Sequence, residues 1–546
     1  MLKTTANNLF RRLEQLNGIG AALSRERDIE RLLENILEAA KTLTGADGGT
    51  LYRVTDDQSA LRFEIMRTDS LGIRLGGTTG QRIDLPDLPL RRADGSPNDA
   101  LVAAHAAIHD CTVNIADVYA EAGFDFSGTR AFDQRTGYRS QSFLTVPMKN
   151  HDGELIGVLQ LLNALDPETG EVVPFSDADQ SLTESLASQA AIALSNRLLI
   201  TQLERLFESF VKLINVAIDE KSPYTGGHCE RVPALTMMLA EATDATTTGP
   251  LAGFHMTERD RYELQMAGLL HDCGKITTPV HVVDKATKLQ TIYDRIGLID
   301  TRFEVLKRDA ELAALRAQLA LRPVVDAEAE AMAVSGLQRE IQNIEADRAF
   351  LRRCNQGSEA MQEMDQLRVR VIGSQRHWRN VDGVHTAFLT AEEMENLTIR
   401  SGTLTQAERD TINYHIVATI KMLETLPWPH HLKNVPEYAG GHHERMDGKG
   451  YPRGLTREQM SVQARMMGVA DIFEALTAAD RPYKRGMKLS QALGIMQKMV
   501  HNGHIDPDLF DVFVRERVYE RYGREFLEPA QVDEVPPEIL ALAVRG

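Results

Sequence analysis

The chain has 546 residues, of which 43% are hydrophobic and 25% are charged. These values are ordinary for a folded globular protein and exclude a disordered or fibrous chain, and the length predicts two domains with a connecting element. Lys and Arg together number 61 against 78 Asp and Glu, so the net charge is −17. Such a surface repels nucleic-acid polymers and anionic membranes, and a small anionic substrate would need a local basic pocket.

The cysteines and the N-terminal residues bear on the cellular compartment. Cysteine occurs four times, without the paired spacing of a disulfide framework, which suits a reducing environment. The N-terminus is polar and helical in pattern, and it lacks the apolar segment of a signal peptide. No run approaches the roughly 18 consecutive apolar residues of a membrane span. We therefore expect a cytoplasmic protein that has neither a membrane nor a nucleic-acid polymer as a partner.

Residues 1–180 alternate between helical and strand patterns. Residues 27–45 place apolar side chains at helical spacing. A turn at residues 151–154 joins two of the predicted strands into a hairpin. Four segments are predicted to be strands because apolar and polar residues alternate in them: 48–54, 61–66, 142–150 and 156–164. This order predicts an α+β sensor domain with an N-terminal helix.

Residues 181–220 form one helical segment that contains neither glycine nor proline. A seam recurs in it at alternating steps of three and four residues, the spacing of a parallel two-stranded coiled coil. Asn196 falls at an a position, where a buried amide commonly fixes register and a two-stranded state. The segment is therefore predicted to be a signalling helix that forms a homodimer; the alternative is a helix packed on its own domain. The seam consists of Leu182, Ser185, Gln189, Ile192, Asn196, Leu199, Leu203, Leu206, Phe210, Leu213 and Ala217.

Residues 221–510 are almost wholly helical in pattern and are predicted to form a second, all-α domain, followed by a helical extension over 511–546. An insertion at about 286–400 interrupts this domain. Within the insertion, residues 300–372 are rich in Glu, Arg, Ala, Gln and Leu, and Pro323 breaks the pattern. Two long exposed helices folded back as a hairpin are therefore predicted, with no visible chemistry.

The second domain carries five short motifs rich in His and Asp. Each buried imidazole or carboxylate needs a partner, and a metal ion provides several at once. Imidazoles with a few carboxylates suit Fe, Mn or Zn, and one Asp can present its two oxygens to two cations. Two metals would hold a hydroxide in line with a phosphodiester, so the set predicts a phosphohydrolase site, although each motif alone is weak. The motifs are YTGGHCERV (224–232), HDCGK (271–275), INYHIVATI (412–420), GGHHERMDGKGYP (440–452) and VADIFEALTAADRPYK (469–484).

These motifs resemble those of the HD-GYP family of bacterial cyclic di-GMP phosphodiesterases, a subgroup of the HD phosphohydrolases. HDCGK corresponds to the family's HDxGK, and HHERMDGKGYP to its HHExxDGxGYP. The resemblance covers about 221–300 and 400–510. It implies two divalent metal ions per chain, Fe or Mn first, with Zn, Mg or Ni as alternatives, and Asp272 as the bridge between them. The implied metal ligands are His228, His271, Asp272, His415, His442, His443 and Asp471.

The resemblance also implies roles in substrate binding. Lys275, catalytic together with Asp272, would face the scissile phosphate, while Arg481 and Lys484 would hold the phosphates of the substrate. Tyr451 belongs to the family's signature Gly-Tyr-Pro loop, which would shape the substrate pocket or a partner surface. These basic residues would supply the local positive charge that the acidic surface otherwise lacks.

The function that this resemblance implies is hydrolysis of cyclic di-GMP to linear pGpG and, more slowly, to GMP. Tyr224 stands where relatives with a third metal have Glu, and a phenol is a poor ligand at neutral pH, so two metals are expected. A mixed guanine–adenine cyclic dinucleotide is an alternative substrate. The alternatives to an enzyme are a catalytically silent receptor or docking platform for a cyclase partner, and a di-iron sensor. The complete set of implied ligands favours hydrolysis.

Residues 25–200 resemble a GAF domain, which implies a six-stranded antiparallel sheet with flanking helices. The most specific stretch is 114–148, followed by Asn163, Phe175 and Asp179, spaced like the Asn-Lys-Phe-Asp-Glu motif of the GAF domains that bind cyclic nucleotides. A structural role for this motif, tying the sheet to a helix, is the alternative to ligand binding. A cyclic mononucleotide is the first candidate ligand; a linear metabolite, or dimerisation without any ligand, are the others.

Overall fold

The computed structural model describes residues 2–221, 227–320, 327–357, 360–479 and 486–542. The chain divides into two compact units, Met1–Phe207 and Glu208–Gly546. In the described ranges, no helix is both long enough and apolar enough to cross a membrane.

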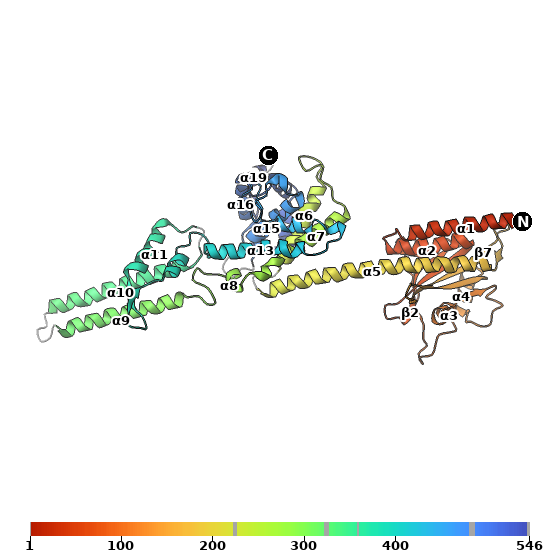
Figure 1. The fold of residues 1–546 in the computed structure, drawn as a ribbon, viewed down its shortest axis with the longest axis horizontal. Helices are drawn as coiled ribbons and strands as arrows, with labels where there is room; N and C mark the ends of the chain where they lie inside the picture. The colour runs from red at the N-terminus through yellow and green to blue at the C-terminus, as the bar shows by residue number, and fades with distance from the viewer. Residues whose placement is uncertain (1, 222–226, 321–326, 358–359, 480–485, 543–546) are drawn as a thin grey trace. The chain divides into compact units, whose positions relative to one another are not determined.

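The first unit is an antiparallel sheet with helices on both faces, as Figure 1 shows. The main path of the sheet is β3-β2-β1-β7-β6-β5, with β4 paired to β2 and β8 paired to β7. This arrangement confirms the predicted α+β class. The elements in chain order are α1 (Leu2–Leu23), α2 (Ile29–Thr44), β1 (Ala46–Val54), β2 (Ala60–Thr68), β3 (Ile73–Gly76), η1 (Gly77–Thr79), β4 (Leu88–Pro89), α3 (Val102–His109), β5 (Val113–Ile115), α4 (Ser127–Thr136), β6 (Phe143–Lys149), β7 (Leu155–Leu165), β8 (Val172–Val173) and α5 (Asp177–Lys221).

All four strands predicted from alternation are present as β1, β2, β6 and β7. In the centre of the sheet, Leu51 of β1 pairs with Ile65 of β2 on one side and with Leu159 of β7 on the other. β6 and β7 form the predicted hairpin, with Val146 opposite Leu159. The other strands, β3, β4, β5 and β8, have only two to four residues, which is too short for alternation to reveal them.

The two faces of the sheet carry separate cores because successive side chains of a strand point to opposite faces. Leu51 and Leu159 belong to the larger core, which α1, α2 and the first part of α5 cover. Their neighbours Tyr52 and Val158 belong to a smaller core on the other face, beneath α3. Figure 1 shows α3 and α4 on this second face.

The predicted helix at 27–45 is α2, and its ends follow from its sequence. The side chain of Asp28 accepts a hydrogen bond from the backbone N–H of Arg31 at 2.9 Å, which caps the first turn. Gly45 ends the helix with a φ of 68°, a left-handed conformation that glycine adopts without strain. Between these ends, Ile36 and Ala40 face the larger core.

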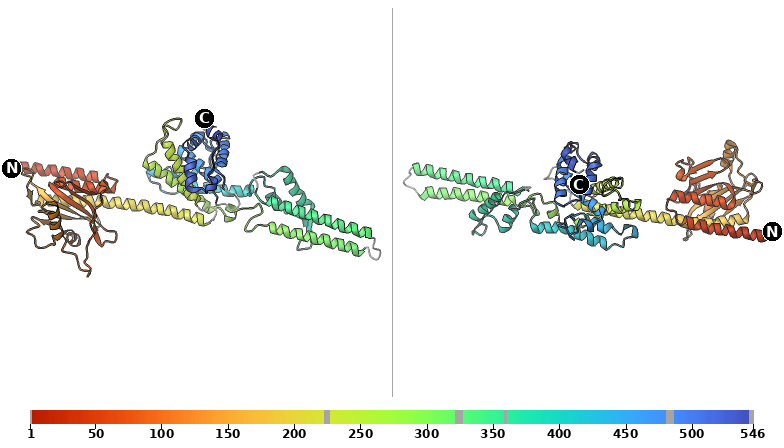
Figure 2. Two further views of the ribbon diagram at one scale, coloured as in Figure 1. Left: turned by 180° about the vertical axis from the view of Figure 1, so that it is seen from behind. Right: turned by 90° about the horizontal axis from the view of Figure 1, so that it is seen from above.

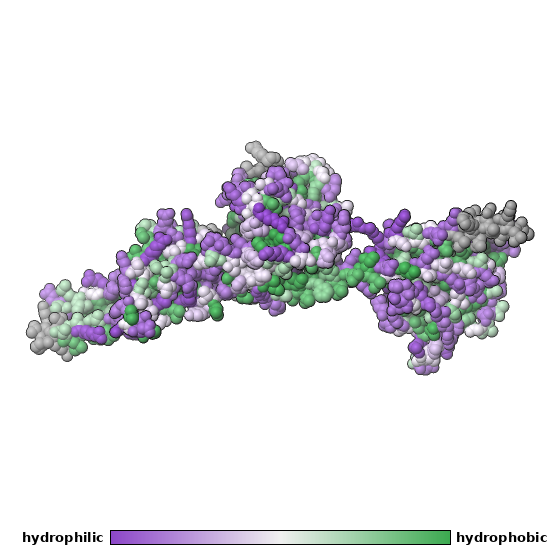
Figure 3. All heavy atoms as spheres, viewed as in Figure 1, coloured by the Kyte–Doolittle hydropathy of each residue, from purple (hydrophilic) through white to green (hydrophobic). Residues whose placement is uncertain are grey.

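α5 packs on the sheet only along its first part. Leu186 and Leu194 are buried in the larger core together with Leu182, which the sequence placed in a dimer seam. Leu182 therefore packs inside its own unit and does not lie in an external seam; that prediction was wrong for the start of the helix. Figure 3 shows apolar side chains along the later part of α5. There the apolar members of the seam are 39% to 65% exposed: Ile192, Leu199, Leu203, Leu206, Phe210 and Leu213.

The second unit is mainly helical, as predicted. Besides the end of α5, its elements are α6 (His228–Asp244), α7 (Glu258–Leu270), η2 (Cys273–Thr277), α8 (Val280–Val283), α9 (Ile296–Ala320), α10 (Ala327–Asn355), α11 (Glu363–Gln375), β9 (His377–Arg379), β10 (His385–Ala387), α12 (Ala391–Leu397), α13 (Gln406–Glu424), η3 (His430–Leu432), α14 (Val435–Gly440), η4 (Arg457–Gln459), α15 (Val462–Thr477), α16 (Leu489–His501), α17 (Pro507–Arg515), α18 (Val518–Phe526), η5 (Pro529–Gln531) and α19 (Pro537–Leu542).

The insertion contains the predicted pair of long helices, α9 and α10, which lie side by side in both views of Figure 2. Ion pairs join them, with Arg348 Nε 2.9 Å from Asp300 Oδ1 and Lys307 Nζ 2.6 Å from Glu345 Oε1. The turn predicted at Pro323 lies outside the described residues. Beyond the prediction, α11, α12 and the two-stranded hairpin β9–β10 give the insertion a hydrophobic core of its own.

Candidate metal centre

The HDCGK motif lies at the C-terminal end of α7, where the short helix η2 packs against α13. His271 is the C-cap residue of α7, and Asp272 precedes the short helix η2. The backbone N–H of Gly274 donates to Thr419 Oγ1 at 2.9 Å, and a Cβ atom at Gly274 would lie 2.0 Å from the carbonyl oxygen of His415. The motif needs glycine here because η2 approaches the backbone of α13 so closely. This contact brings His271 and Asp272 next to His415.

Backbone carbonyl groups orient three of the histidines in the same way. His271 Nδ1 lies 2.7 Å from the oxygen of Gly268, and the Nδ1 atoms of His415 and His442 lie 2.5 Å and 2.6 Å from carbonyl oxygens three residues earlier in the chain. An imidazole that donates from Nδ1 keeps Nε2 as its free acceptor. In each of these residues, Nε2 is therefore the atom available to a metal.

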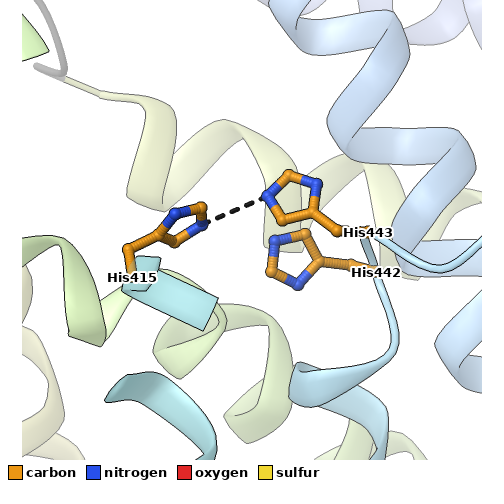
Figure 4. Close-up of side chains that lie close together, drawn as sticks. All are labelled: His415, His442 and His443. Atoms are coloured by element: carbon orange, nitrogen blue, oxygen red, sulfur yellow. Dashed lines mark hydrogen bonds between the residues drawn. The ribbon is translucent and has the colours of Figure 1, made fainter. Parts of the chain in front are cut away.

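The histidines and Asp272 form two groups of three. In each group, one possible ligand atom per residue lies within 4.8 Å of the other two. The first group is His228, His271 and Asp272, and the second is His415, His442 and His443. Figure 4 shows the second group, in which His443 Nε2 and His415 Nε2 are 3.1 Å apart. The two groups thus contain six of the seven implied ligands, although these residues lie far apart in the sequence.

Asp272 stands between the two groups. Its Oδ2 atom lies 3.0 Å from His228 Nε2 and 3.2 Å from His271 Nε2, whereas its Oδ1 atom lies 3.3 Å from His415 Nε2. Asp471, on α15, lies beside the first group, with its Oδ1 atom 3.4 Å from His228 Nε2. The carboxylate of Asp272 is therefore placed to present one oxygen to each group.

Three buried polar atoms of this site indicate whether a metal ion would fit there. Among the described residues, His271 Nε2, His442 Nε2 and Asp272 Oδ1 have no hydrogen-bond partner. Buried polar atoms nearly always have partners, so atoms of this kind that converge on one place need an explanation. Imidazole nitrogens and a carboxylate are ligands for divalent Fe, Mn or Zn. The residues present fit such cations.

The protonation states also suit metal binding. Burial and the positive charge of His271 lower the pKa of His442 to about 4, and burial holds the pKa of His443 well below its usual value. Burial acts to raise the pKa of Asp272, but the charges of Lys275 and His271 outweigh it and hold this pKa well below the usual value. At neutral pH His442 and His443 are therefore neutral imidazoles and Asp272 is an ionised carboxylate, the forms that bind metals.

Matches to family profiles cover both units. The GAF profile matches residues 28–194, and two HD-domain profiles match residues 225–343 and 390–509. The chain therefore combines a GAF domain with an HD domain. The two candidate metal groups lie within the matched ranges of the HD domain, and the sheet described above is the GAF domain.

Curated relatives match this chain over short segments. The 3'3'-cGAMP-specific phosphodiesterases 1 and 3 of Vibrio cholerae are 48% identical over 81 residues and 39% identical over 111 residues. These segments are 15% and 20% of this chain, and 19% and 23% of those proteins. A cyclic di-GMP phosphodiesterase of Pseudomonas aeruginosa is 50% identical over 74 residues, 14% of this chain and 17% of that protein. The matches thus span less than a quarter of each relative's length.

The chain also shows similarity to solved GAF domains. The GAF domain of an Acinetobacter phosphoenolpyruvate-protein phosphotransferase is 14% identical, with a TM-score of 0.26, over 35% of this chain and 98% of that one.

One buried carboxylate of the HD domain escaped the sequence analysis. Glu474 Oε2 lies 2.6 Å from His228 Nδ1, and Glu474 Oε1 lies 2.7 Å from Arg231 Nη2. Burial acts to raise the pKa of Glu474, but its bonds with His228 and Arg231 lower it to about 2. Glu474 follows Asp471 by one turn of α15, and this spacing is the only signal that the sequence offered.

The residues implied in substrate binding are only partly described. Lys275 Nζ lies 2.5 Å from Asp272 Oδ2, so the lysine reaches the metal site. The ring of Tyr451 stacks on His443, with ring centroids 4.9 Å apart and planes 23° from parallel. Arg481, Lys484 and Tyr224 lie outside the described residues.

The GAF motif residues make contacts within their own domain. Asn163 Oδ1 accepts a hydrogen bond from the backbone N–H of Gln141 at 2.7 Å, which ties β7 to the loop before β6. Phe175 is buried in the larger core. Asp179 Oδ1 lies 2.9 Å from Arg12 Nη1 and so joins the start of α5 to α1. These contacts agree with the structural interpretation of the motif.

Proposed function

We propose that the HD domain is a two-metal phosphodiesterase that hydrolyses a cyclic dinucleotide under the control of the GAF domain. The observation that carries this proposal is the position of Asp272, whose two oxygens face two separate groups of imidazoles. A carboxylate shared by two cations suits a two-metal site that hydrolyses a phosphodiester by in-line displacement. The activities for which the relatives from Vibrio cholerae and Pseudomonas aeruginosa are named support the same class of substrate.

The proposed ligands divide between the two sites. His228, His271 and Asp471 would hold one cation and the histidines of the second group the other, with Asp272 shared. When bound, two divalent cations, Fe or Mn first, supply an activated water and neutralise charge that builds on the phosphodiester. The neutral imidazoles need no deprotonation before they bind. His228 differs from these imidazoles. Burial and the charge of Lys275 act to lower its pKa, but its bonds with Asp272 and Glu474 outweigh them and raise this pKa to about 9. A cation must therefore displace a proton from His228.

We infer that the basic residues next to this centre bind the phosphates. Lys275 is the one whose position is described: its ammonium group lies against Asp272 and is only partly exposed. We propose that Arg481 and Lys484 bind the phosphates of the substrate. Arg481 would do so through its planar guanidinium group, and Lys484 through its single ammonium group. The Tyr451 ring stacks on His443 and would form one side of the substrate pocket. The first product would be a linear dinucleotide, pGpG when the substrate is cyclic di-GMP.

We propose that α5 carries the signal from the GAF domain and forms a homodimer through its later part. The exposed apolar seam from Ile192 to Leu213 supports this pairing, because the described residues of this chain leave it uncovered. Asn196 lies within the seam and would fix its register. A cyclic mononucleotide is our first candidate for the GAF ligand.

The proposal is tested by incubating the purified, metal-loaded chain with cyclic di-GMP, 3'3'-cGAMP and cyclic di-AMP. Separating linear dinucleotides from mononucleotides identifies the substrate and the number of bonds cut. Asp272→Ala should abolish turnover because it removes the shared ligand, and Asp506→Ala, at a buried carboxylate outside both groups, is the control for folding. Full activity with both metals retained in Asp272→Ala would refute the proposal.

The same samples separate the alternatives. A catalytically silent receptor or docking platform for a cyclase partner would bind a cyclic dinucleotide without product in any metal state. A di-iron sensor would change its visible spectrum with oxygen while the cyclic dinucleotides remained intact.

A further inference from the structure

A third group of possible metal ligands lies in the GAF domain, apart from the residues used so far. His105 and His109 are one turn apart on α3, and Asp99 precedes that helix. One possible ligand atom from each of the three lies within 4.8 Å of the other two. Side chains four residues apart share one face of a helix, so both imidazoles project toward the same point.

The geometry of this group is convergent. A single oxygen, Asp99 Oδ1, lies 3.3 Å from His105 Nδ1 and 2.6 Å from His109 Nε2. The two imidazole rings have centroids 4.5 Å apart. The edge of His105 also packs against Phe124, at 5.2 Å between centroids, which restricts the orientation of its ring. Three ligand atoms thus face one small volume on the surface of the domain.

Asp99 does not have a helix-capping role. Asp99 is not the cap of α3, because the N-cap residue is Leu101 and no side chain bonds to the first turn. The hydrogen bond with His109 lowers the pKa of Asp99, so its carboxylate is ionised at neutral pH. The side chains of Asp99, His105 and His109 are 48%, 29% and 45% exposed. An ion from solution can therefore reach all three.

We propose that Asp99, His105 and His109 form a binding site for a divalent transition-metal ion of the Zn²⁺ class in the GAF domain. Two imidazole nitrogens and one carboxylate oxygen select such an ion over Ca²⁺ or Mg²⁺, which prefer oxygen ligands alone. Three protein ligands leave a coordination position for water. This site is independent of the HD domain and of its proposed activity.

Metal binding here would act on the sheet through α3. Val102, in the first turn of that helix, is buried with Phe126 and Phe143 in a small core on the second face of the sheet. An ion held by Asp99 before the helix and by His109 at its end would fix α3 against this core. We therefore expect the ion to stabilise the GAF domain against unfolding, because it binds the folded state alone.

The test is equilibrium dialysis of the full chain against Zn²⁺, with bound zinc counted per chain. The variants are His109→Gln and Asp99→Asn, and the control is His151→Gln. His151 is 61% exposed and lies 3.2 Å from Asp152, but the pair belongs to no three-residue cluster among the described residues. All are repeated in an Asp272→Ala background, so that zinc in the HD domain is distinguished from zinc in the GAF domain.

The wild type and His151→Gln should bind one zinc more than His109→Gln and Asp99→Asn, in both backgrounds. Cobalt in the same dialysis should give a visible absorption that the two site variants lack. Circular dichroism without metal establishes that each variant is folded. Equal zinc counts and equal cobalt spectra in the folded site variants and the wild type would overturn the proposal.

Discussion

Glu474 and His228 form a buried pair in which the carboxylate lies 2.6 Å from Nδ1, while the other ring nitrogen, Nε2, lies 3.0 Å from Asp272. Glu474 is 1% exposed and also pairs with Arg231. Its charge is therefore retained inside the domain by two cationic partners. The carboxylate holds the imidazole in the orientation that directs Nε2 at the metal site.

This pair predicts the effect of Glu474→Gln. The amide cannot stabilise the imidazole as the carboxylate does, so the metal affinity of the HD domain should fall about 10–100-fold. Competition with a coloured chelator measures that affinity. The control is Glu263→Gln, at a carboxylate that is also buried but accepts a hydrogen bond from the backbone of Asn434 at 2.6 Å. An equal loss in both variants would mean that Glu474 acts only on stability.

The candidate ligand histidines could be predicted from the sequence because they occur in motifs with fixed internal spacing, as His271 and Asp272 do. Glu474 could not, since its role depends on α6 and α15 lying side by side, which local patterns do not encode. The same limit explains Leu182. Its heptad spacing fits an external seam and an internal core equally well, and only the position of the sheet decides between them.

Replacing Lys275 should separate catalysis from metal binding. In Lys275→Ala the metal content should stay at the wild-type level, because the amine is not a ligand, while turnover should fall by a factor on the order of 10²–10³ through loss of a phosphate contact. Elemental analysis and product formation are measured on the same sample. Lys449→Ala, at a lysine that is 79% exposed, is the control. If bound metal falls in parallel with turnover, Lys275 is structural instead.

The metal-free HD domain should lose stability in mildly acidic solution. Burial and the charge of His271 lower the pKa of His442 to about 4 in the folded state, against about 6.5 when unfolded. The unfolded chain therefore binds more protons between these values, so the contribution of His442 is present above about pH 6.5 and is lost as the pH falls toward 4. The contribution of His228 to the free energy of unfolding changes with pH in the opposite direction. Because the pKa of His228 is raised to about 9, this contribution is lost as the pH rises from about 6.5 toward 9.

Both tryptophans, Trp378 and Trp428, lie in the second unit, so their fluorescence reports its unfolding alone. After removal of metal by a chelator, the free energy of unfolding in urea should decrease between about pH 6.5 and pH 5. His442→Gln should flatten this decrease, whereas His255→Gln, at a side chain that is 75% exposed, should leave it unchanged. If the free energy of unfolding falls equally with pH in His442→Gln and the wild type, the lowered pKa of His442 is not the cause of the decrease.

The exposed seam of α5 predicts a particular result for Asn196→Leu. A buried amide weakens a helix pair but excludes slipped and higher-order states, so leucine should tighten self-association while loosening its register. Sedimentation should then show a stronger dimer or a larger assembly, and any effect of a GAF ligand on turnover should shrink. Glu204→Leu adds the same side chain at an exposed position outside the seam and is the control. Self-association and regulation that match the wild type in Asn196→Leu would exclude the later part of α5 as the path of the signal.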